Sequence, residues 1–518
     1  MRNDFAARTA LTVLISALAP VFCAPSAGAQ DLVIYHTNDV HGYAFEELDG
    51  EGNVVRIGYD RLKALVDSDP APAKLLLDAG DVLHGQAFAT VRQGGLMAEV
   101  LSLAGYDALA AGNHDFDYGY GRLLELSGGY RLRFLAANVL GGDGTAILAP
   151  YLVRSWSGLK VGIFGLSTPM TRTSTDPRNV QGLEFADPIE TARAAVDLLK
   201  AEGVDLIVAL MHMGSEPYCE PTSQAIAERV PGIDIAIDGH SHSVTVIQIT
   251  REDGSRAVVA SAGAFFENVG RIAVDRDADG GFSVSASIIP ASSPEIQRIR
   301  PDQAMREALN ALKSDLDDEL GGILMTVPFD LDGSRQNMRS SSTNLGRLVC
   351  AAMAAASGAD IALLNGGSVH DSIAKGEVTR GQLLSVFPYG DSVYRISVTG
   401  EVLLASLVRG FGQPGAGGFP QFWGMEIEAE RRLTTASDGT EEEILAPKSV
   451  TVGGKPLDPK ATYVLAVNDF MYSGGDDYSM FANIPFEDFG PLMEIFRDYM
   501  TMMDHDALKA VADAVVLR

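Results

Sequence analysis

Five short apolar runs in the first half of the chain each end in a group of polar residues. The runs comprise residues 32–35, 75–77, 108–111, 206–210 and 233–237. Amphipathic patterns at Ile189 to Glu202 and Ser223 to Val230 separate some of them and predict helices. Buried strands that alternate with amphipathic helices predict a layered α/β domain. Ligands of such folds bind beyond the carboxyl ends of the strands, which is where the polar groups lie.

A change of composition marks the middle of the chain. Pro290, Pro294 and Pro301 interrupt a stretch rich in Ser and Arg, and a helix-like segment follows from Asp302 to Leu320. Beyond it the pattern of a second α/β region includes Gly-rich turns. We therefore expect a first domain over residues 30–295, a helical linker over 296–325 and a second domain over 326–518.

The first 29 residues have the pattern of an export signal. Arg2 and Arg8 flank a short basic region, an apolar run extends from about Ala10 to Ala24, and Ala27-Gly28-Ala29 offers small residues for cleavage. The run contains Pro20, and neither it nor any later stretch reaches the ~20 apolar residues of a membrane span. We expect cleavage near Ala29 and a periplasmic or secreted protein without stable membrane insertion.

Charge and cysteine content exclude some functions. The 518 residues carry a formal net charge of −28, which argues against binding polymeric nucleic acid. Small phosphorylated ligands remain possible because local cations and metals can override the global field. Beyond the signal, only Cys219 and Cys350 occur, outside any CxxC pattern, so a thiolate zinc site is not expected. They could pair in an oxidising compartment, but we expect them to be unpaired because they fall in different predicted domains.

The polar groups after the strands contain residue types that bind divalent transition metals. In chain order they are Asn38-Asp39-Val40-His41, Gly80-Asp81, Gly112-Asn113-His114-Asp115-Phe116-Asp117, His212 and Gly239-His240-Ser241-His242. Carboxylate, amide oxygen and imidazole together suit Zn²⁺, Mn²⁺ or similar ions. Each element alone is weak, and a lone histidine such as His36 is more often a hydrogen-bonded structural residue. Five of the seven histidines in this half lie in the groups, however, and that conjunction predicts a metal centre.

This order of motifs resembles the calcineurin-like metallophosphoesterase superfamily, and more closely its 5′-nucleotidase branch, which includes bacterial UDP-sugar hydrolases. The block GNHDFDYG, residues 112–119, is the most specific part. The resemblance implies a four-layer α/β-β/α metallophosphoesterase domain, a smaller α/β 5′-nucleotidase C-terminal domain, and two divalent ions such as Zn, Mn or Co. It implies that one ion is held by Asp39, His41, Asp81 and His242, and the other by Asp81, Asn113, His212 and His240.

The chemistry that the resemblance implies is hydrolysis of a phosphate ester. Two cations ~4 Å apart lower the pKa of a shared water and stabilise an in-line displacement at phosphorus. His114 fits the role of a further donor as charge develops. Asp117 would hold its imidazole in one tautomer and favour the protonated form, although it could also be a helix N-cap. Asp78 is expected to support the ligands, and Asp115 is not expected to be one.

The second half resembles the 5′-nucleotidase C-terminal domain at residues 343–346, 365–367, 387–390 and 468–476. Two aromatics of this domain sandwich the base in relatives, and Tyr389 and Phe470 stand at those positions. Base stacking of this kind contributes ~1–3 kcal/mol. The resemblance also implies that Asp476 contacts ribose hydroxyls and that Arg339 and Asn365 contact substrate. Core packing of the aromatics, and a Gly-rich turn at Asn365, are the alternative interpretations.

One position departs from the family pattern. Relatives usually have Arg where the run Asn365-Gly366-Gly367-Ser368-Val369-His370 ends in His370. Histidine carries less charge at neutral pH and cannot form a bidentate fork. We therefore include His370 among the substrate-binding candidates, and expect phosphate binding that is weaker, pH-dependent or supplied by another cation.

The leading hypothesis is an exported hydrolase of nucleoside 5′-phosphates, with nucleotide sugars as further candidate substrates. A second hypothesis keeps the metals and changes the ester to a cyclic nucleotide, a sugar phosphate or a sulfur-oxyanion ester. A third is a non-catalytic nucleotide-binding protein; the loss of a metal ligand or of His114 would support it, and none is lost. Because metal and base sites fall on different domains, the resemblance also predicts a hinge closure that brings phosphate to the metals.

Overall fold

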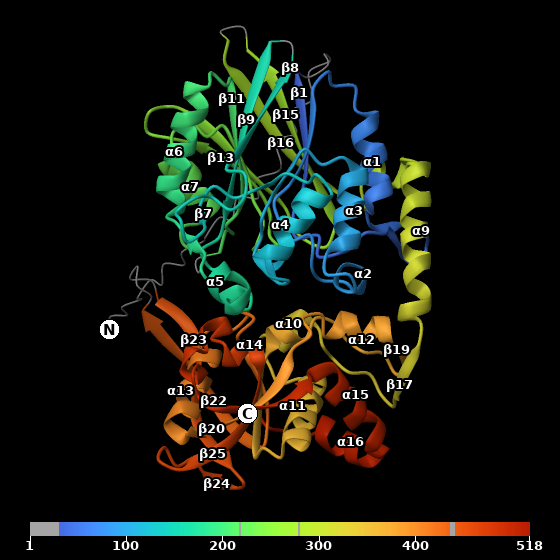
Figure 1. Ribbon diagram of the computed structural model, residues 1–518, viewed down its shortest axis with the longest axis vertical. Coiled ribbons are helices and arrows are strands. Elements are labelled where there is room, and N and C mark those ends of the chain that lie inside the picture. Colours follow the sequence, from blue (N-terminus) through green and yellow to red (C-terminus); the bar gives the residue numbers. More distant parts are fainter. Residues whose placement is uncertain (1–30, 157, 217–218, 278–279, 436–440, 518) are drawn as a thin grey trace, which may run out of the picture.

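The computed structural model describes residues 31–517 apart from residues 157, 217–218, 278–279 and 436–440. The predicted export signal lies outside the described residues. Figure 1 shows two α/β bodies stacked along the long axis, the N-terminal one in blue to green and the C-terminal one in orange to red. The two-domain α/β fold predicted from the sequence is confirmed.

Two six-stranded sheets face each other in the N-terminal body. The first has the order β16-β15-β1-β4-β5-β6, and its strands are β1 (Leu32–Thr37), β4 (Lys74–Asp78), β5 (Ala108–Ala110), β6 (Phe134–Leu135), β15 (Asn268–Arg276) and β16 (Phe282–Pro290). The second has the order β13-β14-β12-β11-β9-β8, with β8 (Tyr151–Trp156), β9 (Leu159–Ser167), β11 (Leu206–His212), β12 (Ile235–Ile237), β13 (Val244–Thr250) and β14 (Arg256–Ala262). The five predicted strands are β1, β4, β5, β11 and β12.

Helices cover the outer face of each sheet and complete four layers (Figure 1). The first sheet is covered by α1 (Tyr59–Ser68), α3 (Gly95–Ala104), α4 (Tyr120–Gly129) and α9 (Gln303–Leu320), and the second by α6 (Pro188–Ala201) and α7 (Ser223–Arg229). Alternate residues of a strand point to opposite faces. Ile34 therefore lies in the core between the sheets, whereas Val33 and Tyr35 pack against helices. Burial of both faces explains why these strands read as continuous apolar runs.

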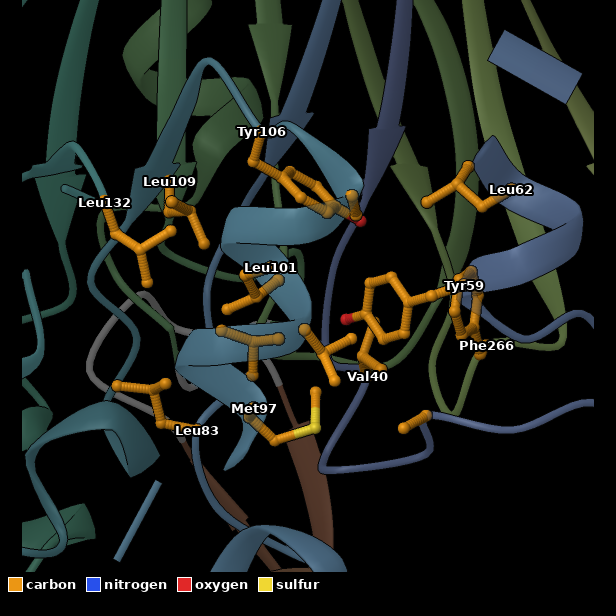
Figure 2. Packing of buried hydrophobic residues seen from close by; sticks show 14 of the residues in the cluster. Val40, Tyr59, Leu62, Leu83, Met97, Leu101, Tyr106, Leu109, Leu132 and Phe266 are labelled. Atoms are coloured by element: carbon orange, nitrogen blue, oxygen red, sulfur yellow. The ribbon is translucent and has the colours of Figure 1, made fainter. Parts of the chain in front are cut away.

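The apolar residues between the polar groups anchor the loops at the strand ends. Val40 lies between Asp39 and His41, and Leu83 follows Asp81 by two positions; both side chains are fully buried in the helix-side core (Figure 2). Tyr59 packs edge-on against Phe266 in the same cluster, with ring centroids 4.9 Å apart. Such packing holds the loops rigidly, so the polar side chains that they carry are placed by the core.

The C-terminal body is built on a five-stranded sheet of order β21-β18-β25-β20-β26. Its strands are β18 (Ile361–Asn365), β20 (Ser392–Thr399), β21 (Pro420–Trp423), β25 (Thr462–Asn468) and β26 (Phe486–Pro491). The helices α11 (Asn344–Ser357), α15 (Leu492–Met502) and α16 (His505–Ala512) pack on one face, and α13 (Gly400–Phe411) packs on the other. Smaller sheets pair β17 (Ile323–Val327) with β19 (Gly376–Thr379), and β22 (Met425–Thr435) with β23 (Glu441–Val452) and β24 (Lys455–Pro456).

Helix α9 packs on the N-terminal body through Met305, Leu309 and Leu316, and β17 follows it into the C-terminal body. Short elements of the two bodies face one another across the space between them: α2 (Ala87–Thr90) and α5 (Thr171–Ser174) on one side, and α10 (Arg335–Met338), α12 (Arg380–Val386) and α14 (Asp469–Tyr472) on the other (Figure 1). Within the described part of the chain, no helix combines the length and apolarity needed to cross a bilayer. Cys219 and Cys350 are both buried and unpaired, as predicted.

Candidate metal centre

The seven predicted metal ligands come together at the carboxyl ends of the strands. Asp39 and His41 follow β1, Asp81 follows β4 and Asn113 follows β5, while His212 ends β11 and His240 and His242 follow β12. Five of them are almost completely buried, and His240 and His242 are partly exposed. The parallel strands β1, β4 and β5 bring their ends to the same edge, which explains why residues far apart in sequence meet here.

One group of possible ligand atoms comes from Asp39, His41 and His242, whose nitrogen and oxygen atoms lie within 4.8 Å of one another. The Nε2 atoms of His41 and His242 are 3.1 Å apart, and Asp39 Oδ1 lies 3.5 Å from His242 Nε2. Imidazole nitrogens and a carboxylate oxygen that converge in this way form a cation site.

A second group comes from Asp81, His212 and His240. Asp81 Oδ2 is 3.1 Å from His212 Nε2 and 4.0 Å from His41 Nε2, so this one oxygen lies between the two groups. The side-chain oxygen of Asn113 is 2.8 Å from Nδ1 of His240. The arrangement fits the predicted pair of cation sites with Asp81 as the shared ligand.

The chemistry of the donor atoms fits divalent cations. His212 Nδ1 donates to the carbonyl oxygen of Ala79 at 2.7 Å, which leaves the Nε2 lone pair for a metal. Burial lowers the pKa of His212, but the charges of Asp81 and Asp39 near that Nε2 atom outweigh it and raise this pKa to about 10, so a bound cation would have to displace its proton. Burial lowers the pKa of His240 to about 3 and that of His41 well below its usual value, so both imidazoles are in the neutral form that binds metal.

The backbone of the ligand loops is strained. Asp39, His41, Asp81, His240 and His242 all have positive φ, between 48° and 81°. Residues other than glycine adopt this conformation at a cost, and they concentrate at functional sites. Packing around Gly112 is equally restrictive, because a Cβ atom there would lie 2.2 Å from Asp81 Oδ1. The loops therefore direct the ligand side chains toward one point, and the backbone conformation that does so is locally unfavourable.

Two further aspartates support the loops. The carboxylate of Asp115 accepts hydrogen bonds from the backbone N–H groups of Asp81, Val82, Leu83 and Gly112, at 2.8–3.0 Å. Asp78 Oδ1 accepts from the N–H of Gly80 at 2.8 Å. Asp78 Oδ2 accepts from the hydroxyl of Thr37, so both carboxylates are occupied by hydrogen bonds, and the structure offers Asp115 no role as a ligand.

His114 and Asp117 form a hydrogen-bonded pair beside the metal groups. His114 Nδ1 donates to Asp117 Oδ2 at 2.7 Å, and the hydroxyl of Thr175 donates to Asp117 Oδ1 at 2.7 Å. Burial lowers the pKa of His114, but the charges of Asp117 and Asp81 outweigh it and raise this pKa to about 9. The N-cap interpretation of Asp117 is wrong, because the next helix, α4, begins after Gly119 and has no side-chain cap.

A cavity of about 590 Å³ extends from the metal groups into the C-terminal body. The predicted substrate residues on its wall are Arg339, Asn365, Tyr389, Phe470 and Asp476. His370 is described but is not part of this wall; its Nε2 atom lies 2.6 Å from the hydroxyl of Tyr389. Asn365 Nδ2 donates to Asp476 Oδ2 at 2.9 Å, so these two candidates support each other.

The sequence analysis missed several residues at the site, among them Arg335 and His84. Arg335 also lines the cavity, and its spacing of four from Arg339 is a signal that could have identified it. His84 is fully buried, with Nδ1 3.3 Å from Asp117 Oδ2. Nothing in the local pattern distinguishes His84 from a structural histidine, because several of its contacts come from the other domain.

Comparison with known proteins decides the family. Residues 32–244 match the calcineurin-like phosphoesterase family, and residues 322–483 match the 5′-nucleotidase C-terminal domain. The 5′-nucleotidase precursor of Thermus thermophilus has the same fold, with a TM-score of 0.78 and 31% sequence identity over 91% of this chain and 96% of that one. The chain belongs to the 5′-nucleotidase family of calcineurin-like metallophosphoesterases. The predicted family is thereby confirmed.

Curated relatives of this 5′-nucleotidase family member agree. The 5′-nucleotidase of Vibrio cholerae is 28% identical, over 90% of each chain. The trifunctional nucleotide phosphoesterase protein YfkN of Bacillus subtilis is 29% identical over 92% of this chain, which spans 34% of that longer relative. The family consists of metal-dependent phosphoester hydrolases, and calcineurin-like phosphoesterases use a dinuclear metal centre, for which the two groups of ligand atoms are the candidates.

Proposed function

We propose that this protein is an exported hydrolase of nucleoside 5′-phosphates. The observation that carries the proposal is the cavity that joins the metal groups of one domain to aromatic, carboxylate and arginine side chains of the other. A nucleotide presents a phosphate, a ribose and a base in a row, and the cavity wall presents a matching group for each. Bound Zn, Mn or Co ions would supply an activated water and charge stabilisation at phosphorus.

At the phosphate end, the protein contributes cationic donors. With Nδ1 of His114 held by Asp117, its Nε2–H is free to donate to an oxygen that gains charge during the reaction. The raised pKa of His114 keeps this proton in place at neutral pH. Arg335 and Arg339 add positive charge to the same cavity, which compensates for histidine at the position of the family arginine.

At the nucleoside end, the two aromatic rings are each supported from one side. The ring of Tyr389 stacks on His84 at 4.6 Å and 11°, and a Cβ at Gly475 would lie 2.5 Å from the ring of Phe470. Both residues also line the cavity, where a base can stack on them. Asp476 and Asn365 lie on the same wall as acceptors and donors for ribose hydroxyls.

A substrate panel on the metal-loaded protein tests the proposal. The panel should contain a nucleoside 5′-monophosphate, a UDP-sugar, a 2′,3′-cyclic nucleotide, a sugar phosphate and a sulfur-oxyanion ester. We expect the highest kcat/KM for the 5′-monophosphate. Preference for one of the last three would favour the second hypothesis, and absence of turnover on every nucleotide, with both metal sites filled, would reject the first.

Two parts of the proposal have separate tests. Sequencing the N-terminus of protein recovered outside the cytoplasm should find a start near Gln30, and a retained Met1 would contradict export by cleavage. The predicted domain closure is tested by a crosslink that holds the domains apart, which should abolish turnover. An unchanged rate in the crosslinked protein would show that closure is not required.

A further inference from the structure

His84 links the two domains at the edge of the candidate active site. It follows Asp81 in the loop after β4, and its side chain has 0% exposure. In the proposed reaction its only part is to support the ring of Tyr389. Its surroundings come from both bodies: Asp117 and His114 from the N-terminal one, and Pro388 and Tyr389 from the loop between α12 and β20 in the other.

The two ring nitrogens of His84 each lie near an oxygen atom, but only Nε2 makes a hydrogen bond, and Nδ1 is buried without a hydrogen-bond partner. Nδ1 lies 3.3 Å from Asp117 Oδ2, and Nε2 lies 3.3 Å from the carbonyl oxygen of Pro388. A neutral imidazole with its proton on Nε2 donates to Pro388, and an imidazolium adds an ion-pair contact between Nδ1 and Asp117. In either form the ring occupies the space between the carboxylate that orients His114 and a backbone group of the second domain.

Three nearly parallel rings meet at this point. His84 stacks on Tyr389 with centroids 4.6 Å apart and an 11° interplanar angle, and on His114 at 5.7 Å and 18°. Tyr389 is itself 5.9 Å from His114. Offset stacking of this kind is directional, so a shift of Tyr389 changes the preferred orientation of His84.

His370 fixes the position of Tyr389. Its Nε2 atom lies 2.6 Å from the Tyr389 hydroxyl, and its backbone N–H donates to the carbonyl of Val386 at 3.1 Å. The histidine that replaces the family arginine therefore supports the ring that stacks on His84. The chain of contacts from His370 through Tyr389 and His84 ends at Asp117.

We propose that His84 is a positioning residue that couples docking of the C-terminal domain to the geometry of the His114–Asp117 pair. The inference rests on the proposed phosphoester hydrolysis. With the domains docked, Pro388 and Tyr389 hold the imidazole of His84 against Asp117. With the domains apart, these two contacts are lost, and the Asp117 carboxylate keeps its hydrogen bonds to His114 and Thr175 without a fixed His84 beside them. The His114–Asp117 pair therefore exists in both states, and His84 fixes its orientation only when the substrate cavity is closed.

Two substitutions separate this role from packing. His84→Phe keeps a ring for Tyr389 and removes both polar contacts, whereas His84→Gln keeps an amide that can donate to Asp117 or Pro388. Tyr118→Phe is the matched control, because the Tyr118 ring lies 5.4 Å from His84 and its hydroxyl is buried without a hydrogen-bond partner. Metal content and melting temperature are measured for each variant.

The kinetic result expected for His84→Phe is a loss of about 10–100-fold in kcat, with KM within about threefold and both metals retained. His84→Gln should recover part of the loss, and Tyr118→Phe should match the wild type. In a His114→Asn background, His84→Phe should cost about twofold or less, because the pair through which it acts is already broken. Wild-type kcat in His84→Phe, or an equal loss in both backgrounds, would overturn the inference.

Solution scattering provides a readout that does not depend on turnover. We expect a larger radius of gyration for His84→Phe than for the wild type, because the variant loses the hydrogen bond to Pro388 that favours the docked arrangement. Identical scattering curves would overturn the docking role. A wild-type protein that is inactive on the whole substrate panel would instead reject the proposed function, and the scattering comparison would still decide the role of His84.

Discussion

We expect Asp391 to make the free energy of unfolding depend on pH, and we expect Asp391→Asn to remove that dependence. Its carboxylate lies on the cavity wall and accepts a hydrogen bond from Asn468 Nδ2 at 2.8 Å. Burial, followed by the charge of neighbouring Asp469, raises the pKa of Asp391 from 3.8 to about 7. Asp176 of the N-terminal body adds to the rise, and Asn468 opposes it. The native protein therefore retains a proton that the unfolded chain has lost over this range of pH.

The sign of the effect follows from the direction of the shift. Below about pH 4 the Asp391 carboxyl is protonated in both the folded and the unfolded state, and its contribution to stability is complete. As pH rises through about 7, the folded protein must also give up this proton from a buried position, and that contribution is lost. A change from 3.8 to about 7 corresponds to about 4 kcal/mol. Because Asp391 faces the cavity, solvent screening lowers this to about 2–3 kcal/mol. Asp391→Asn removes the charge at nearly constant volume, so it should stabilise the protein at pH 8 and change little at pH 4.

Calorimetry between pH 4 and pH 8.5 at constant ionic strength measures the difference. For a domain of about 190 residues, 2–3 kcal/mol corresponds to a rise of roughly 4–12 °C in melting temperature at the alkaline end. Asp360→Asn is the control, because Asp360 is exposed in the same domain. A difference between Asp391→Asn and the wild type that does not change with pH would refute the reasoning.

Three further substitutions test other parts of the site. Phe470→Ala should lower kcat/KM for nucleoside 5′-phosphates by about 5–150-fold through lost stacking, and should spare a phosphate ester without a base; equal losses on both would contradict a base-binding role. His114→Asn should reduce kcat by about 10²–10⁴-fold with unchanged metal content, as measured by steady-state kinetics and elemental analysis, and normal turnover would refute its role. Arg178→Gln removes the 2.7 Å ion pair with Asp469 across the domains, and because the Arg178 side chain is 53% exposed, the free energy of unfolding should change by no more than about 1 kcal/mol.

The parts of the fold that could be predicted are those where both faces of a strand are buried. Strands β1 and β11 are buried along their whole length and read as unbroken apolar runs. Strands β13 and β16 were not predicted, because exposed positions recur along them and their apolar residues are interleaved with Ser, Thr and Gln. An alternation of period two in so polar a stretch is a weak signal, and only pairing with β14 and β15 fixes those strands.

The same distinction applies to the site. The convergence of the candidate metal ligands could be predicted because their loops are short and each follows a buried strand, so local sequence places them. His84 could not, since its contacts to Pro388 and Tyr389 involve residues about 300 positions away. The replacement of the family arginine by His370 was visible in the sequence, but its hydrogen bond to Tyr389 depends on how the intervening turn folds.

Counting metal ions per chain tests the central claim most directly. Protein loaded with Zn²⁺, Mn²⁺ or Co²⁺ and freed of excess metal should contain two ions per chain, as measured by elemental analysis. Asp81→Ala should lower this number for both sites, because Asp81 Oδ2 is shared by the two groups of ligand atoms. Wild-type protein that retains no transition metal under any loading condition would contradict the account.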